Sequence, residues 1–377
     1  MFGRRIPLFE VFGFSVRLDP SWFLLAILIA WSLGGENGYF RATHEGLGPA
    51  AYWLMGAAAA LGLFTSIVLH ELAHSVMARR FGLAIKGITL FIFGGVAEMT
   101  EEPESPRAEF LVAVAGPLAS VLIAASCFGI GQVLRASGTS VAIYGVVAFL
   151  AWMNAALVLF NLVPAFPLDG GRMLRALLWR VRGDLTWATR ITAGIGSFFG
   201  LVLMALGVFS LVQGDFVGGL WRFVLGLFLR QAAQSSKRFQ LARRLLEGEA
   251  VRDFMAEPPT AVPRHLPLRE FVETYLYRRG PELYPVVQDD RLVGSIDLES
   301  VKAVPQAEWD RQSVGTVAKS LASSPVLDPD LDALAALTAL RAMPGGRALV
   351  VEGDRLVGMV SLQDLARLVA LKGELEG

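Results

Sequence analysis

The sequence is poor in cysteine and in charge, and each shortage excludes a class of protein. Cys127 is the single cysteine among 377 residues, so one chain forms no disulfide and a cysteine-based zinc site is excluded. We read Cys127, which lies in an apolar run, as a small apolar packing residue. Charged residues make up 18% of the chain, whereas soluble domains contain about 25%. Basic and acidic residues balance at 34 each, without a basic cluster interleaved with aromatic residues, so no nucleic-acid partner is indicated.

Apolar residues take the place of the missing charge, at 54% of the chain with a mean hydropathy of +0.51. The first 22 residues have no continuous apolar segment and no small-residue cleavage site, so we expect no cleavable signal peptide. A membrane-spanning helix needs roughly 20 mostly apolar residues. Six runs approach that length, the first and last being short: 21–34, 51–81, 110–134, 141–163, 191–212 and 216–231. The pattern predicts a polytopic α-helical membrane protein of about six spans, surrounded by a lipid bilayer.

Basic residues are distributed unevenly among the connections between these runs. They gather before the first run, after the second and after the fourth, whereas the other connections hold only Arg41 and Arg135. Because cytoplasmic loops carry an excess of lysine and arginine, we expect a multi-pass protein of the cell membrane with both termini in the cytoplasm. The second and fourth runs then end at the cytoplasmic side.

The sequence HELAH at 70–74 places two of the four histidines near the inner end of the second run. On a helix, residues four apart lie on one face, so His70 and His74 can bind one zinc ion with Glu71 beside it. Zinc held by three protein ligands keeps a position for water, and Glu71 is the natural general base. The alternative is a buried polar cluster without a metal, but ionisable groups within a span usually serve a function.

The third ligand is expected from the segment NLVPAFPLDGG at 161–171, which follows the fourth run. Asp169 lies at the same inner end as the histidines, after two prolines that end the helix. The alternative is that Asp169 only caps the cytosolic helix 172–181, and Glu98 is a second candidate ligand. Asn161 either donates its amide to a developing oxyanion or forms a packing hydrogen bond between helices.

Two segments favour short strands. Apolar and polar residues alternate over 14–18, and the apolar pairs with Gly94–Gly95 in 84–99 favour a hairpin. Such a sheet either serves structure alone or offers an edge to which an unwound substrate adds as a strand.

The C-terminal segment has a soluble pattern and an internal repeat. Residues 283–301 align with residues 347–365 at an offset of 64, and each unit reads as strand, turn, strand and helix. We therefore expect a membrane domain over 1–235, a linker over 236–250, and a cytosolic α/β domain over 251–377 with repeats at 251–305 and 314–372.

HELAH and NLVPAFPLDGG together resemble the motifs of the site-2 protease family of intramembrane zinc metalloproteases, peptidase family M50. AGPLAS at 115–120 resembles the start of the family's middle core helix, and the family has a membrane-associated sheet where 84–99 lies. The resemblance implies one Zn²⁺ per chain on His70, His74 and Asp169, with Glu71 activating water and Asn161 helping to hold the substrate or the oxyanion. The resemblance covers about residues 1–235. The sequence differs from the best-known bacterial subgroup in the absence of a PDZ-like insert.

The repeat resembles a pair of CBS motifs, the tail of another subgroup of that family. CBS pairs often bind adenine nucleotides, through a serine or threonine followed three residues later by aspartate. Ser361 and Asp364 match this pattern, whereas Asp297 and Ser300 in the first repeat do not. The alternative is a pair that mediates only homodimerisation.

The resemblance implies a protease that cuts the transmembrane segment of a single-span membrane protein and is modulated by nucleotide at its tail. The alternative from another class is a CBS-regulated channel or transporter. A transporter has no need of HELAH and a deep Asp-Gly together, which separates the two hypotheses.

Overall fold

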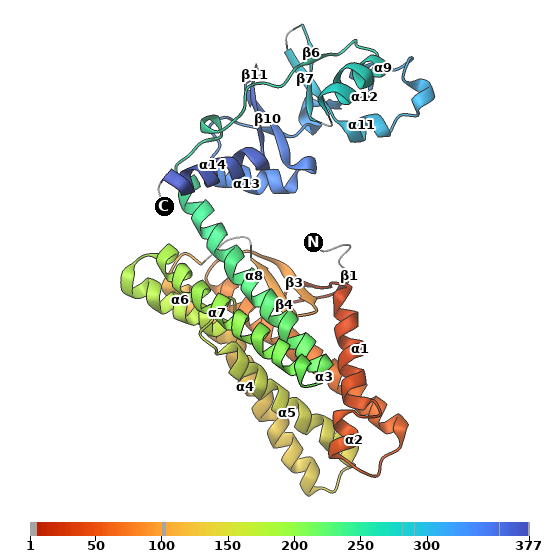
Figure 1. Ribbon diagram of the computed structural model, residues 1–377, viewed down its shortest axis with the longest axis vertical. Coiled ribbons are helices and arrows are strands. Elements are labelled where there is room, and N and C mark those ends of the chain that lie inside the picture. Colours follow the sequence, from red (N-terminus) through yellow and green to blue (C-terminus); the bar gives the residue numbers. More distant parts are fainter. Residues whose placement is uncertain (1–5, 100–102, 281, 290, 354, 376–377) are drawn as a thin grey trace. The chain divides into compact units, whose positions relative to one another are not determined.

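The computed structural model describes residues 6–99, 103–280, 282–289, 291–353 and 355–375, with only the backbone of residues 86, 96–99, 279, 344, 373 and 375. The chain divides into two compact units, Met1–Arg238 and Phe239–Gly377 (Figure 1). Each unit has hydrophobic clusters of its own.

The N-terminal unit consists mainly of helices (Figure 1). They are α1 (Ser21–Gly34), α2 (Tyr39–Thr43), α3 (Pro49–Arg80), α4 (Pro106–Ala136), α5 (Val141–Asn161), α6 (Asp169–Arg182), α7 (Leu185–Val212) and the first part of α8 (Phe216–Leu246), which ends beyond Arg238. Among the described residues, five segments are long and apolar enough to cross a membrane: Ser21–Thr43, Pro49–Arg80, Pro106–Ala136, Val141–Asn161 and Leu185–Val212. The predicted architecture of apolar spanning helices is confirmed. The sixth expected run, 216–231, lies in α8, where Arg222 and Arg230 interrupt the apolar residues and keep the helix outside these five.

Local sequence signals set several helix ends. Ser105 caps α4 by accepting a hydrogen bond from the Ala108 amide at 3.2 Å, directly before Pro106 in the first turn. Asp184 caps α7 in the same way through the Trp187 amide at 2.9 Å. Gly183 ends α6 in the left-handed conformation, with φ of +76°. These ends fix where the polar connections leave the apolar helices.

A four-stranded sheet completes the N-terminal unit. Its order is β1 (Ile6–Val11), β2 (Phe14–Leu18), β3 (Ile85–Phe91) and β4 (Gly94–Met99). The pairs β1–β2 and β3–β4 are antiparallel, and β2 lies parallel to β3 with Val16 opposite Ile88. The expected strand over 14–18 and hairpin over 84–99 are both present and lie in one sheet, whereas β1 was not expected.

The sheet packs against the part of α3 that contains HELAH. Phe14, Val16 and Leu18 alternate along β2 and are all buried, as the period of two predicts. They form one cluster with Val68 and Leu72 of α3, joined by Ile88 and Leu90 of β3. The sheet therefore holds the turn of α3 that carries both histidines.

The C-terminal unit repeats one α/β arrangement twice (Figure 1). Its strands are β5 (Val262–Pro263), β6 (Tyr284–Gln288), β7 (Arg291–Ile296), β8 (Lys319–Ser320), β9 (Val326–Leu327), β10 (Arg347–Glu352) and β11 (Arg355–Ser361). Its α-helices are α9 (Leu268–Phe271), α10 (Tyr277–Arg279), α11 (Leu298–Lys302), α12 (Val314–Val317), α13 (Ala333–Ala342) and α14 (Leu362–Leu375), with a π-helical turn at Val272–Leu276.

The two repeats have matching sheets. The first sheet has the order β5–β6–β7–β8 and the second the order β11–β10–β9. The β6–β7 hairpin shifts register between Val286 and Val287, and the β10–β11 hairpin shifts between Val350 and Val351, so the irregularities recur at the repeat offset. The boundary between the units falls within the segment 236–250, which is helical as far as Leu246, the end of α8.

Candidate metal centre

Three side chains from two helices converge at a buried point in the N-terminal unit. His70 and His74 come from α3, and Asp169 begins α6. The Nε2 atoms of the two imidazoles lie 3.1 Å apart. The Asp169 carboxylate lies 3.1 Å from Nε2 of His70 through Oδ2 and 3.2 Å from Nε2 of His74 through Oδ1. All three residues are buried.

The other nitrogen of each imidazole is occupied by α4. Nδ1 of His70 lies 2.9 Å from Oγ of Ser120, and Nδ1 of His74 lies 2.7 Å from the carbonyl oxygen of Val112. A hydrogen bond from Nδ1–H fixes the tautomer in which Nε2 keeps its lone pair. Both Nε2 atoms are therefore directed at the same point as the Asp169 carboxylate.

Gly116 of α4 closes this point with backbone alone. A Cβ at this position would lie 2.1 Å from Nε2 of His74 and 2.6 Å from Nε2 of His70. A side chain would therefore occupy the space between the two nitrogens, and only glycine leaves that space open.

The geometry fits a tetrahedral zinc ion. Two ligand atoms that each lie about 2.0–2.1 Å from a tetrahedral centre are roughly 3.3–3.4 Å apart. The observed separations of 3.1, 3.1 and 3.2 Å are close to that value. Two imidazole nitrogens and a carboxylate oxygen are also donors that zinc accepts, with a fourth position left for water.

The charges at this point favour an ionised carboxylate. Burial by itself would raise the pKa of the Asp169 carboxyl, but the adjacent side chains of His74 and His70 hold that pKa well below its usual range. The side chain of Asp169 is thus available as an anionic ligand at neutral pH.

Glu71 is half-buried on α3 and lies against the backbone of β4. A Cβ on Gly95 would lie 2.4 Å from Cγ of Glu71 and 3.0 Å from its Cδ. The base expected from HELAH therefore lies against β4, an outer strand of the sheet. The other candidate ligand, Glu98, is a residue of β4 whose side chain is outside the described part of the chain.

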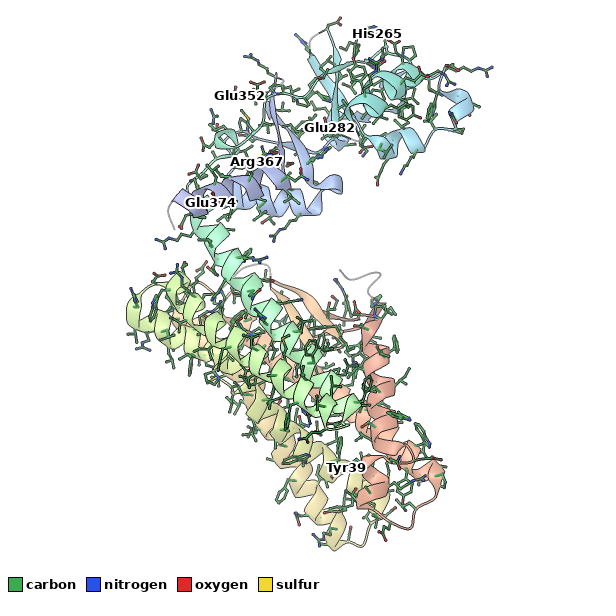
Figure 2. The ribbon with its side chains drawn as sticks, viewed as in Figure 1. Tyr39, His265, Glu282, Glu352, Arg367 and Glu374 are labelled. Carbon is green, nitrogen blue, oxygen red and sulfur yellow. The ribbon has the colours of Figure 1, made fainter. Side chains whose placement is uncertain are left out.

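The remaining two histidines are not part of this group. His44 follows α2, and its Nδ1 lies 2.8 Å from Oγ1 of Thr43. His265 belongs to the C-terminal unit (Figure 2). Within the described residues, His70, His74 and Asp169 form the one group of three or more residues that has the spacing of metal ligands.

Comparison with known proteins connects this geometry to a family. The family model for Peptidase family M50 matches residues 58–141 and 133–207. A Mycobacterium tuberculosis protein named as the zinc metalloprotease Rip3 is 36% identical over 366 residues, covering 97% of this chain and 92% of that protein.

The chain belongs to peptidase family M50.

Two further proteins are similar to this chain. The zinc metalloprotease MJ0392 of Methanocaldococcus jannaschii is 29% identical over 98% of both chains. The solved structure of a site-2 protease from the same organism is 29% identical, with a TM-score of 0.45, and the match covers 62% of this chain and 95% of that one. The CBS domain model matches residues 251–305 and 318–371. This M50 peptidase is therefore a zinc metalloprotease with a CBS pair in its C-terminal unit, and the resemblance seen in the sequence is confirmed.

Asn161 is the last residue of α5, and its half-buried side chain forms no hydrogen bond with another described residue.

The two candidate nucleotide-binding residues of the CBS pair, Ser361 and Asp364, form hydrogen bonds with each other. The Ser361 hydroxyl and amide donate to Oδ2 of Asp364 at 2.6 and 2.9 Å, at the start of α14. In the first repeat Asp297 accepts from Ser300 and from Lys319, the latter at 2.6 Å.

The sequence of this M50 peptidase does not by itself indicate the contribution of α4. Gly116 and Ser120 lie within AGPLAS, which resembles only the start of a core helix. The small residues of that segment were the available signal, because a helix without bulky side chains permits a close approach. The carbonyl of Val112 gives no sequence signal, since every residue has one.

Proposed function

We propose that this zinc metalloprotease cleaves a peptide bond within or next to the transmembrane segment of a single-span membrane protein. The convergence of His70, His74 and Asp169 is the observation that supports this most. Two of the three lie on α3, a helix long and apolar enough to cross a membrane. The family name alone leaves the substrate class open, whereas ligands inside an apolar helix favour a substrate that lies in the bilayer.

In this proposal each residue has a defined role. His70 and His74 hold one zinc ion per chain through Nε2, and Asp169 through its carboxylate. When bound, zinc supplies Lewis acidity and lowers the pKa of a water molecule to about 7. Glu71 takes the proton from the attacking water and passes it to the leaving amine nitrogen. Asn161 donates its amide to the developing oxyanion.

The outer position of β4 supports substrate binding at the edge of the sheet. A transmembrane helix hides its peptide groups in its own hydrogen bonds, so it must unwind before hydrolysis. An unwound segment that pairs with the outer edge of β4 regains backbone hydrogen bonds as an added strand. Because Gly95 lies against Glu71, the added strand runs close to the general base.

The substitution Glu71→Gln tests the assignment. The variant should retain about one zinc per chain and lose cleavage of a co-purified transmembrane substrate by about 10²–10⁴-fold, the range for a lost general base. Glu45→Gln, at an exposed position, is the matched control and should cleave as the wild type does. His70→Ala should lose the zinc, measured by metal analysis. Cleavage at the wild-type rate by Glu71→Gln would show that another group is the base.

The C-terminal unit is the site of the proposed regulation. We infer that an adenine nucleotide binds the CBS pair at Ser361 and Asp364, and that the pair also supports a homodimer. The distribution of basic residues supports a cytoplasmic location for both termini, where nucleotide is present. ATP or AMP should raise the melting temperature of the full chain, and Asp364→Ala should remove that shift whereas Asp297→Ala should not. No shift with any adenine nucleotide would leave dimerisation as the role of the pair.

A further inference from the structure

A buried ion pair joins α4 to α6. Glu109 is 0% exposed and Arg175 is 4% exposed. The guanidinium Nε of Arg175 donates to Oε1 of Glu109 at 2.6 Å, and a second guanidinium nitrogen contacts the same oxygen. The other carboxylate oxygen of Glu109 has no hydrogen-bond partner among the described residues. The charge of Glu109 is thus balanced by a residue of another helix.

The face of α4 that carries Glu109 also orients the histidines. Val112 accepts from His74 through its carbonyl, and Ser120 contacts His70 through its hydroxyl. Positions 109, 112, 116 and 120 follow at steps of three or four residues, so they share one face of the helix. One face of α4 therefore contacts both of the helices that supply ligands.

Arg175 holds the segment that presents Asp169. It lies on α6, the helix that Asp169 begins, and its guanidinium is 5.1 Å from the centre of the Phe166 ring. Phe166 belongs to the connection between α5 and α6, and its amide donates to the carbonyl of Thr192 at 3.3 Å. Arg175 thus lies on the helix of the third ligand and contacts the connection that leads to it.

We propose that Glu109 and Arg175 are positioning residues that hold the Asp169 carboxylate at the two imidazoles. A buried ion pair adds little net stability, because desolvation cancels most of the attraction, and apolar replacements of both partners are often neutral or stabilising. Stability alone therefore does not account for this pair. A directional pair between α4 and α6 fixes how α6 meets α4, and hence where Asp169 lies. The inference rests on the proposed role of Asp169 as a ligand.

The test is the metal affinity of full-length variants. In the double variant Glu109→Met with Arg175→Met, zinc affinity measured against a competing chelator should fall about 10–100-fold, the usual cost of losing a supporting residue at a metal site. The visible absorption of the Co²⁺-loaded protein should change, because it reports the arrangement of the ligands. Arg175→Lys keeps the charge but loses the planar fork, and should bind zinc with intermediate affinity.

A control separates positioning from general destabilisation. Tyr52 is buried near the start of α3, 18 residues before His70, and its hydroxyl donates to the carbonyl oxygen of His44 at 2.6 Å. Tyr52→Phe should lower the melting temperature and leave zinc affinity within about twofold. If the double variant, or Arg175→Lys where the double variant does not fold, binds zinc as the wild type does with an unchanged Co²⁺ spectrum, the inference is overturned. Full zinc content in His70→Ala would instead contradict the proposed ligand set.

Discussion

At the scale of single residues, the candidate metal centre depends on the absence of a Cβ atom at Gly116. Gly116 contributes no Cβ, and the space that a Cβ would fill lies between Nε2 of His70 and Nε2 of His74. Helix α4 can therefore hold both imidazoles through their Nδ1 atoms and still leave the Nε2 atoms accessible to a metal ion. A glycine inside a helix costs about 1 kcal/mol relative to alanine, and here the close approach justifies that cost.

Gly116→Ala tests this directly. The added methyl group should displace one or both imidazoles, so zinc affinity should fall by at least about tenfold, as it does when ligand orientation is disturbed. Gly129→Ala is the matched control on the same helix, because a Cβ there meets nothing within 4 Å. Chelator competition measures both variants. Equal zinc affinity in the two would show that the imidazoles tolerate a side chain at position 116.

Residue by residue, the sequence indicated the ligands better than their supports. HELAH and Asp169 were expected because a spacing of four and a buried acid after a broken helix are local signals. Glu109 and Arg175 were not expected, because their partnership joins positions 66 apart. When two charged residues lie far apart along the chain, the sequence does not indicate that they form an ion pair. Asn161 remains a prediction, since its side chain makes no described hydrogen bond.

At the scale of elements, α7 and α8 pack through facing glycines. A Cβ on Gly200 would lie 2.6 Å from the carbonyl oxygen of Gly226, and a Cβ on Gly207 would lie 2.7 Å from the carbonyl oxygen of Gly219. The two helices therefore touch backbone to backbone, which is how membrane helices gain packing energy without a hydrophobic driving force.

Gly200→Ala should destabilise the N-terminal unit by about 1–3 kcal/mol, because the methyl group meets a carbonyl that cannot move alone. Gly194→Ala, on the same helix, meets only the end of the Lys237 side chain at 3.9 Å. That control should be neutral or stabilising by up to about 1 kcal/mol. Thermal unfolding in detergent gives both values, and equal melting temperatures would contradict the close packing.

The elements themselves were largely predictable. Long apolar runs gave α3, α4, α5 and α7, and the alternation over 14–18 gave β2. The sequence did not indicate β1, because Pro7 and exposed side chains obscure any alternation in Ile6–Val11. The strand is defined instead by its pairing with β2. The pairing of β2 with β3 joins segments about 70 residues apart, which periodicity alone does not determine.

At the scale of the whole molecule, the two units have separate hydrophobic clusters and different proposed ligands. The candidate metal centre lies within residues 1–238 and the CBS pair within residues 239–377. A ligand stabilises only the unit that binds it, by about 2.7 kcal/mol at one hundred times its dissociation constant. Zinc should therefore act on one unfolding transition and not on the other.

Removing zinc with a chelator should lower the melting temperature of the N-terminal unit by roughly 5–10 °C, since 1 kcal/mol corresponds to about 2–4 °C for a unit of this size. The transition of the C-terminal unit should move by less than about 1 °C. Scanning calorimetry of the full chain in detergent resolves the two, and His70→Ala should behave like the chelated wild type. A chelator effect confined to the C-terminal unit would contradict the assignment.

The outer position of β4 has a consequence for what the enzyme releases. Strand pairing has a period of two, and a slip of one residue turns every side chain to the opposite face. A substrate that pairs with β4 can therefore shift past Glu71 in steps of two residues and keep the same faces buried. Product fragments of one substrate should then differ in length by even numbers of residues. Mass spectrometry of the fragments measures these lengths.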